Sequence, residues 1–246
     1  MNTTDLLLGV LKADAPVQQV VVGSLWTTAV LAGDPLRCGL ASTLRPLTHE
    51  AGRPPVAYAG RLLERSGREL AELLRSPSTV EASIGMAAFN ALLDVDEERC
   101  TEVNAQQVIL QRGAGRRVAI VGHFPFVEQM RRAAAECWVL ELNPHPGDLP
   151  AERANDLLPQ ADVVALTGTS LINHTFDGLI GLCRPGAFVV LLGGSAPLTP
   201  VLFDRGVSAV AGTRVVDIPA AVRAVSEGAT FRQIPGKRLL TMMQEN

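Results

Sequence analysis

The fold class of this chain is set by one stretch of sequence, RRVAIVGHFPFVEQMRRAAAECWVLELN, residues 116–143. Two short, continuous apolar runs, at 116–122 and 137–143, flank a helical segment at 125–136. Apolar runs that alternate with amphipathic helices are typical of a parallel sheet buried on both faces. The stretch therefore predicts a strand, a helix and a second strand of a Rossmann-like sheet.

The same alternation continues toward the C-terminus. Further strands are expected at 161–168, 187–194 and 207–212, and further helices at 149–158, 170–183, 199–206 and 218–228. Upstream, AQQVILQRG at 105–113 predicts a linking helix that ends at Gly113. We therefore predict an α/β protein whose C-terminal domain, residues 104–246, is a Rossmann-like parallel-sheet domain.

The N-terminal part has a different order of elements. A short helix is expected at 5–12, entered from Thr3 or Thr4. Two β-rich runs, about 19–30 and 36–44, are separated by the turn sequence AGDP at 32–35, which predicts an antiparallel pair. Two helices follow, because Ser66 and Ser78 each begin an S-x-x-E capping box. Residues 1–103 are therefore predicted to form a small α+β domain.

The composition describes an ordinary globular protein. The 246 residues are 47% hydrophobic and 19% charged, with a formal net charge of −3. The arginines are scattered, so nucleic acid is not an expected partner. No apolar run approaches the roughly 18 residues of a membrane helix, and no signal-peptide pattern opens the chain, so no membrane partner is expected. We expect a cytoplasmic protein, and a homodimer is the base-rate expectation for its assembly.

The cysteines give no sign of a structural framework. Cys38, Cys100, Cys137 and Cys183 are far apart and form no C-x-x-C pair. Neither a disulfide framework nor a zinc ribbon is expected from this spacing.

The first strand of the C-terminal domain is followed by Gly122-His123-Phe124-Pro125-Phe126. Ligands of open parallel sheets bind beyond the carboxyl ends of the strands, so this loop is a candidate binding loop. It lacks the G-x-G-x-x-G pattern, and its bulky side chains disfavour ordinary dinucleotide binding. The alternative is a turn in which Phe124 or Phe126 fills the core.

Glu141 follows the second strand, 19 residues beyond Gly122. An acid at about this distance accepts hydrogen bonds from a ribose in many Rossmann proteins, and the same position binds adenosine in methyltransferase-like relatives. The alternative is an acid that faces solvent at the end of a strand.

Hydroxyl and amide side chains gather after the third strand. Such groups at a strand end can hold an anion or a carboxylate, although some of them must cap helices. Glycines and a serine follow the fourth strand. Asn90 lies in a helix of the N-terminal part that is crowded with small residues. Its side chain either forms a hydrogen bond to a neighbouring backbone or points into an interdomain cleft. The candidate ligand-binding residues are Gly122, Phe124, Thr167, Gly168, Thr169, Ser170, Asn173, Thr175, Gly193, Ser195 and Asn90.

The histidines raise the question of a metal. His123, His145 and His174 share the strand-end edge with Glu141, and convergence of two or three of these residues would form a metal site. The alternative is that each is a loop histidine with hydrogen-bonding partners only. His123 is also the candidate acid–base residue, with Glu141, because histidine titrates near neutral pH. His49 has no ligand-spaced partner.

Several motifs resemble one known family. VGHFPFV (121–127), LELNP (140–144), ADVVALTGTSLINHT (161–175) and GGSAPLTPVLFDRGVSAVAG (193–212) resemble the "putative heavy-metal chelation" domain family. VVVGSLWTTAV (20–30), CGLAST (38–43) and ASIGMAAFNALL (82–93) are similar to the enolase N-terminal-like domain that precedes it there. One departure is GGSAP at 193–197, where the family has a Gly-Pro-Ser/Thr-x-Pro loop.

The resemblance implies an enolase N-terminal-like domain, a Rossmann-like domain partly similar to methyltransferases, and a site between them. It implies a role in metal chelation, or in making or breaking pterin-, flavin- or siderophore-like molecules. The family pattern falls on residues already selected above, with its helix asparagine at Asn90, its Gly-His-Phe-Pro element at 122–125 and its acid at Glu141.

Three hypotheses follow. The first is an enzyme or binding protein for a small metabolite or metal chelate between the domains. The second is a non-catalytic heavy-metal-binding protein in which the histidines and the acid are ligands, with the divalent metal unspecified. The third is an S-adenosylmethionine-dependent transferase, which the bulky 122–126 loop disfavours.

Overall fold

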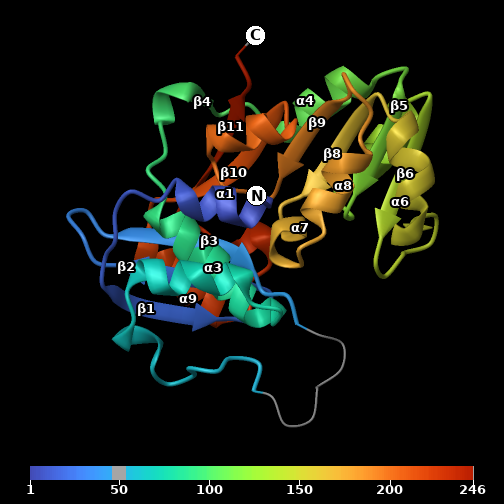
Figure 1. The fold of residues 1–246 in the computed structure, drawn as a ribbon. Helices are drawn as coiled ribbons and strands as arrows, with labels where there is room; N and C mark the ends of the chain where they lie inside the picture. The colour runs from blue at the N-terminus through green and yellow to red at the C-terminus, as the bar shows by residue number, and fades with distance from the viewer. Residues whose placement is uncertain (46–53, 246) are drawn as a thin grey trace.

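The computed structural model describes residues 1–45 and 54–245. Within these ranges the strands form two sheets, a large sheet of eight strands and a small sheet of three. Figure 1 shows the small sheet in blue beside the large sheet, which runs from green to red. His49 lies outside the described residues.

The large sheet contains the predicted parallel sheet. Its neighbours are parallel in the order β7-β6-β5-β8-β9-β10, which is the doubly wound order 3-2-1-4-5-6. The strand order reverses between β5 and β8, and this is where such sheets bind ligands. The six strands are β5 (Arg117–Val121), β6 (Glu136–Glu141), β7 (Leu149–Pro150), β8 (Val163–Thr167), β9 (Phe188–Leu192) and β10 (Ala209–Val215).

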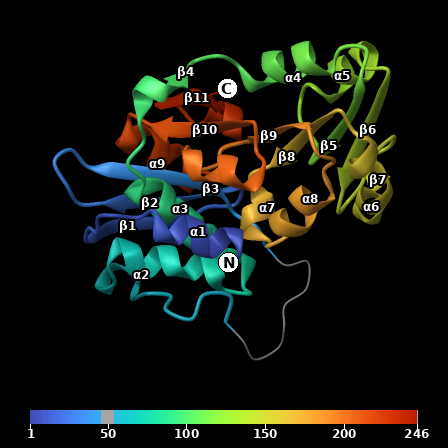
Figure 2. The same ribbon diagram turned by 45° about the horizontal axis from the view of Figure 1, so that its top comes forward.

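Two antiparallel strands, neither of them predicted from the sequence, extend this sheet beyond β10. β11 (Lys237–Met243) pairs along the whole of β10, and β4 (Cys100–Thr101) pairs with β11. Figure 2 shows β4 and β11 at the end of the sheet opposite β7. The sheet is therefore mixed, and β4 comes from residues before 104.

Helices cover both faces of the large sheet, as the continuous apolar strands require. Val118 and Ile120 pack toward α4 (Ala105–Gly113) and α5 (Val127–Ala133), whereas Ala119 belongs to the core on the opposite face. That opposite face carries α6 (Ala154–Leu157), α7 (Thr169–Ile172) and α8 (Phe176–Leu182). Neighbouring residues of a strand point to opposite faces, so this arrangement buries both.

The segment 170–183, which was predicted to hold a helix, does not form one continuous helix. The chain forms α7 and α8 instead, with a break at His174, whose φ is 60°. The side-chain oxygen of Asn173 accepts hydrogen bonds from the backbone N–H and the hydroxyl of Thr175. These bonds replace the next helical turn, because Asn side chains compete with backbone partners.

Other predicted helices are shorter or tighter than expected. The segment 149–158 begins with β7 and reaches α6 only at Ala154, and 199–206 is a 3₁₀ segment. The 3₁₀ segments are η1 (Leu62–Glu64), η2 (Glu72–Arg75), η3 (Glu97–Arg99), η4 (Ala151–Arg153), η5 (Leu158–Gln160), η6 (Pro200–Arg205) and η7 (Phe231–Gln233).

The small sheet has the antiparallel order β1-β2-β3, with strands β1 (Val17–Val22), β2 (Trp26–Leu31) and β3 (Arg37–Ser42). The predicted pair on either side of 32–35 is confirmed as β2 and β3. The single strand predicted over 19–30 is wrong, because the chain turns back at 23–25. The N–H of Gly23 donates to the carbonyl oxygen of Trp26, 2.9 Å away, and closes that turn.

Two helices enclose the small sheet. α3 (Thr79–Leu92) lies so close to β3 that a Cβ on Gly39 would overlap the carbonyl oxygen of Ala87. The next residue, Leu40, packs on the opposite face in one cluster with Val225 of α9 (Ile218–Ser226). The helix predicted at 218–228 thus packs on the small sheet, rather than completing the alternation over the large one.

The first helices begin close to their predicted starts. α1 (Thr3–Gly9) is capped by Asn2 rather than by Thr3 or Thr4. The capping box at Ser66 is confirmed at the start of α2 (Gly67–Ala71). Ser78 caps α3, but the Glu81 side chain accepts from the N–H of Ala57 instead, so the second box is not closed.

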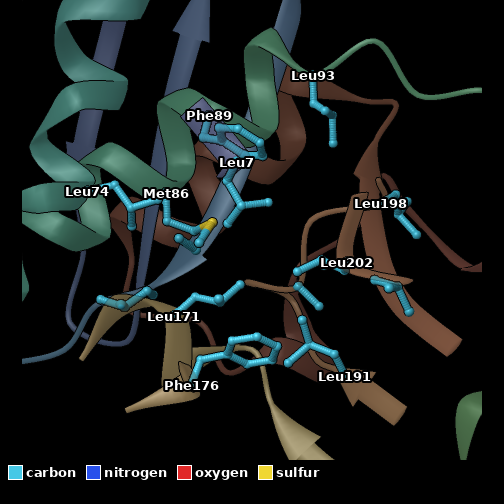
Figure 3. Packing of buried hydrophobic residues seen from close by; sticks show 14 of the residues in the cluster. Leu7, Leu74, Met86, Phe89, Leu93, Leu171, Phe176, Leu191, Leu198 and Leu202 are labelled. Atoms are coloured by element: carbon cyan, nitrogen blue, oxygen red, sulfur yellow. The ribbon is translucent and has the colours of Figure 1, made fainter. Parts of the chain in front are cut away.

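One hydrophobic core joins the two parts of the chain. Figure 3 shows Leu7, Met86 and Phe89 from the N-terminal part packed in one cluster with Phe176 and Leu191 of the C-terminal part. No helix within the described ranges is long and apolar enough to cross a membrane.

Candidate functional site

A cavity of about 400 Å³ lies where β5, β6 and β8 end. Its lining residues all fall between Val121 and Leu179. We expected a site between the two predicted domains, but this cavity takes its whole lining from the C-terminal part. The candidate residues that it brings together are Gly122, His123, Phe124, Glu141, Thr167, Thr169, Ser170, Asn173 and Thr175.

Gly122 brings the first loop close to the end of β8. Its φ is 108°, a conformation that side chains disfavour. A Cβ here would lie 3.1 Å from the Cβ of Thr167 and 3.2 Å from the ring of Phe124. The position therefore needs glycine for both its backbone conformation and its space.

The alternative considered for this loop, in which Phe124 or Phe126 fills the core, holds for Phe126. Phe126 is 5% exposed and belongs to the cluster under α5. Phe124 stacks on Phe126, with 5.4 Å between ring centroids and 14° between the planes, and it also lines the cavity. Phe124 therefore offers an apolar surface to a bound molecule.

Hydroxyl groups line the β8 side of the cavity. The Oγ1 atoms of Thr167 and Thr169 lie 2.9 Å apart, so one hydroxyl donates to the other and one proton remains for a ligand. Ser170 is different, because its buried hydroxyl donates to the Thr167 carbonyl oxygen at 2.7 Å and caps the turn.

The break between α7 and α8 places Asn173 at the cavity. Its Oδ1 accepts from the Thr175 hydroxyl at 2.7 Å, and its NH₂ group makes no hydrogen bond within the described part of the chain. That NH₂ group is available as a donor to a ligand. His174 does not join the site, since its Nε2 lies 2.9 Å from the carbonyl oxygen of Ser76 in the N-terminal part.

Glu141 is the last residue of β6 and is half-buried at the cavity. Its Oε2 accepts from the backbone N–H of Leu142 at 3.2 Å. The carboxylate keeps further acceptor capacity for a ligand. The neighbouring Leu142 is 68% exposed, so an apolar side chain stands at the cavity rim.

His123 has a partner, Asp148, that was not predicted from the sequence. Its Nδ1 lies 2.8 Å from Oδ2 of Asp148, and Nδ1 of His145 lies 3.5 Å from the same oxygen. One potential ligand atom from each of these three residues lies within 4.8 Å of the other two. Of the four strand-end residues considered as metal ligands, only His123 and His145 lie close together, and Asp148 lies beside them.

Asp148 is firmly held. Its side chain is fully buried, and its Oδ1 accepts from the Arg131 guanidinium at 2.9 Å. Burial alone would raise the pKa of the Asp148 carboxyl, but hydrogen bonds from His123 and from the His145 backbone, with the charge of Arg131, hold the pKa below its ordinary value. The signal in the sequence was the spacing His145-Pro-Gly-Asp148 in a tight loop.

The cysteines take no part in this cluster. Burial raises the pKa of the Cys38 thiol to about 12 and those of Cys137 and Cys183 to about 11. These thiols are therefore protonated at neutral pH in the absence of a metal.

Four candidate residues lie outside the cavity lining. Gly168 lets the end of β8 approach the 193–197 loop, because a Cβ there would lie 2.6 Å from the Ala196 nitrogen. Gly193 lies in that loop with a φ of 118°. The buried Ser195 hydroxyl accepts from the Ser42 N–H at 2.8 Å, so it ties the large sheet to the small one.

Asn90 is the fourth of these residues. Its Nδ2 donates to the carbonyl oxygen of Leu40 at 2.9 Å, which joins α3 to β3. It also lines a separate cavity of about 280 Å³ between the two parts, with Asp34, Arg37 and Thr213. Asn90 and the strand-end residues therefore line different cavities.

Two family models that share one description match this chain. The DUF364 family model, described as "Putative heavy-metal chelation", matches residues 104–244, more than half of the chain. The DUF4213 model, with the same description, matches residues 4–93. The chain belongs to this family. The resemblance found in the sequence motifs is thus confirmed.

Solved structures of heavy-metal chelation family members share the fold. A protein of unknown function from Desulfitobacterium hafniense is 25% identical, with a TM-score of 0.84 and coverage of 98% of each chain. A second, from Pyrococcus horikoshii, is 19% identical with a TM-score of 0.81 and the same coverage, and it supports the fold alone.

One curated relative also matches. It is an uncharacterized protein of Methanocaldococcus jannaschii, 26% identical over 167 residues. The match covers 65% of this chain and 64% of the relative, which is less than two thirds of that relative's length.

Proposed function

We propose that this chain binds a small polar molecule in the strand-end cavity. The observation that carries the proposal is the convergence of nine candidate residues on one cavity at the point where the strand order reverses. Open parallel sheets bind their ligands at this point. A volume of about 400 Å³ falls within the range of small-molecule pockets.

The cavity lining favours a ligand that donates hydrogen bonds at one edge and accepts them at another. Glu141 accepts hydrogen bonds and suits a hydroxyl or amino group on the ligand. Thr167, Thr169 and Asn173 supply donors and suit a carboxylate or another oxygen-rich group. Phe124 provides an apolar surface for a flat ring. Pterin-, flavin- and catechol-type molecules have this combination of features.

His123 gives the site a group that can exchange protons or bind a metal at its edge. The ring lines the cavity while its Nδ1 lies at hydrogen-bonding distance from Asp148. A histidine oriented by a carboxylate is a common arrangement for proton transfer, and imidazole is also a common metal ligand. Both uses are consistent with a ligand that is a metal chelator.

S-adenosylmethionine is the second candidate ligand, favoured by the position of Glu141 at the end of β6. The methionine end would then lie near Gly122, where Phe124 already packs within 3.2 Å of the Cβ position. Binding would require that ring to move. Pterin-, flavin- and catechol-type molecules therefore fit the cavity better than S-adenosylmethionine does.

The proposal is tested by thermal unfolding with three probes, namely a pterin, 2,3-dihydroxybenzoate and S-adenosylmethionine. At a hundred times its Kd, a ligand of the native state adds about 2.7 kcal/mol, or roughly 5–10 °C in Tm for a chain of this size. We expect such a rise with the pterin or the catechol, and its loss in Glu141→Gln.

Glu152→Gln is the matched control, because Glu152 is exposed next to the cavity and does not line it. It should keep the response of the unmodified chain. No rise with any probe, or an equal rise in Glu141→Gln, would contradict the proposal. A rise with S-adenosylmethionine alone would favour the transferase hypothesis instead.

A further inference from the structure

We propose that His123, His145 and Asp148 bind one divalent transition-metal ion at the rim of the strand-end cavity. The three residues come from two loops, one after β5 and one between β6 and β7, and their ligand atoms already lie within 4.8 Å of one another. Within the described ranges, no other group of three or more His, Cys, Asp or Glu residues meets this spacing.

The distances fit a single ion. Zinc binds nitrogen and oxygen at about 2.0–2.2 Å, and a tetrahedral site therefore holds its ligand atoms roughly 3.4 Å apart. The Asp148 oxygen lies 2.8 Å from Nδ1 of His123 and 3.5 Å from Nδ1 of His145. The rings of His123 and His145 meet edge to face, with 4.8 Å between their centroids. Small side-chain rotations bring these atoms to coordination distance.

The donor set selects the class of metal. Two imidazoles and one carboxylate suit Zn²⁺, Ni²⁺, Co²⁺ and Cu²⁺, whereas Mg²⁺ and Ca²⁺ prefer oxygen ligands alone. Soft metals that require thiolates are disfavoured, because the cluster contains no cysteine.

The surroundings hold the ligands in place. Arg131 donates to Oδ1 of Asp148 at 2.9 Å and to the carbonyl oxygen of Gly147 at 2.8 Å, which fixes the loop and leaves Oδ2 toward the histidines. The charge of Arg131 opposes a nearby cation, but Arg131 also pairs with the Glu128 carboxylate, 2.7 Å away. Carboxylate ligands of metals are commonly held by such outer hydrogen bonds.

The position of the ion connects it with the cavity. Three protein ligands leave at least one coordination position open in a tetrahedral site. Because His123 belongs to both the cluster and the cavity lining, an oxygen or nitrogen of a cavity ligand can occupy that position. This last step rests on the proposed function, whereas metal binding by the three residues does not.

The test uses the full chain without a histidine tag, stripped with EDTA and titrated with Co²⁺ in the absence of any cavity probe. We expect one Co²⁺ per chain, a visible absorption spectrum, displacement by Zn²⁺, and no competition from Mg²⁺. His145→Ala should bind Co²⁺ at least tenfold more weakly. His145 is 65% exposed, so its removal should leave the fold intact, which an unchanged Tm would verify.

His174→Asn is the matched control. His174 is an exposed histidine outside the cluster, and asparagine tolerates its positive φ of 60°. It should bind Co²⁺ as the unmodified chain does. No Co²⁺ binding, or the same affinity in His145→Ala as in the unmodified chain, would overturn the inference. Co²⁺ binding without a response to any cavity probe would support this inference and contradict the proposed function.

Discussion

Gly122 shows how much of the site depends on one backbone position. The residue has a φ of 108°, and the Cβ position is 3.1 Å from Thr167. A side chain here would strain the backbone and separate the first loop from the end of β8. The two strand ends that form the centre of the cavity meet because this side chain is absent.

We therefore predict that Gly122→Ala lowers the free energy of unfolding by about 1–3 kcal/mol. Gly178→Ala is the matched control, since Gly178 lies within α8 with nothing within 4 Å of its Cβ position. It should raise the free energy of unfolding by about 0.5–1 kcal/mol. Urea denaturation measures both. Equal effects of the two substitutions would contradict the account of Gly122.

At this scale the sequence identified most residues of the cavity, because they directly follow strands whose apolar runs are visible. Glu141 and Thr167 are the last residues of β6 and β8. Asp148 was missed because only the folded loop places it beside His123. Ser195 was predicted to bind a ligand because its hydrogen-bonding partner, Ser42, is 153 residues away in the chain.

At the scale of elements, α1 is attached to the rest of the molecule through Asp177 of α8. The Asp177 carboxylate accepts from the Thr3 N–H at 3.0 Å, from the Thr3 hydroxyl, and from Arg205 at 2.9 Å. Burial acts to raise the pKa of Asp177, but these three bonds hold it below its ordinary value of 3.8.

A carboxylate whose pKa is lowered by folding contributes stability above its unfolded pKa, and that contribution is lost as the pH falls through the folded value. We expect Asp177→Asn to be less stable than the unmodified chain at pH 7, with a difference that shrinks below about pH 4. Urea denaturation at pH 7 and pH 3 measures this. Asp204→Asn, at an exposed aspartate in η6, should change stability at neither pH. A difference that stays constant with pH would rule out this role for Asp177.

The elements that the sequence predicted well have patterns that depend on local sequence alone. α4 has its predicted bounds, and the five long parallel strands lie within their predicted ranges or extend past them by one to three residues. β11 was missed because no helix follows it, and β4 was missed because it has only two residues. The break at His174 was missed because Asn173 and Thr175 were considered as ligand residues rather than as partners of each other.

At the scale of the whole molecule, the shared core determines how the chain unfolds. Leu7 and Phe89 are fully buried in the same cluster as Leu191, so the two parts cannot expose their cores independently. Trp26 lies in β2 with its ring 5.0 Å from that of Phe231, and Trp138 lies in β6 of the large sheet. Each part therefore carries its own fluorescent reporter.

We expect one cooperative unfolding transition. The variants Trp26→Phe and Trp138→Phe each leave one tryptophan, and in each variant the fluorescence midpoint in urea should coincide with the midpoint from circular dichroism. If fluorescence and circular dichroism give separate midpoints in either variant, the two parts unfold separately. That result would contradict the prediction that the shared core couples their unfolding.

The bond from the Ser42 amide to the Ser195 hydroxyl has a consequence for hydrogen exchange. This amide proton belongs to the small sheet, but its acceptor belongs to a loop of the large one. It exchanges with solvent deuterium only when that loop moves away from β3 or when the whole chain unfolds. The exchange rate at this single position therefore measures the free energy needed to move the 193–197 loop away from β3, a quantity that neither tryptophan reports.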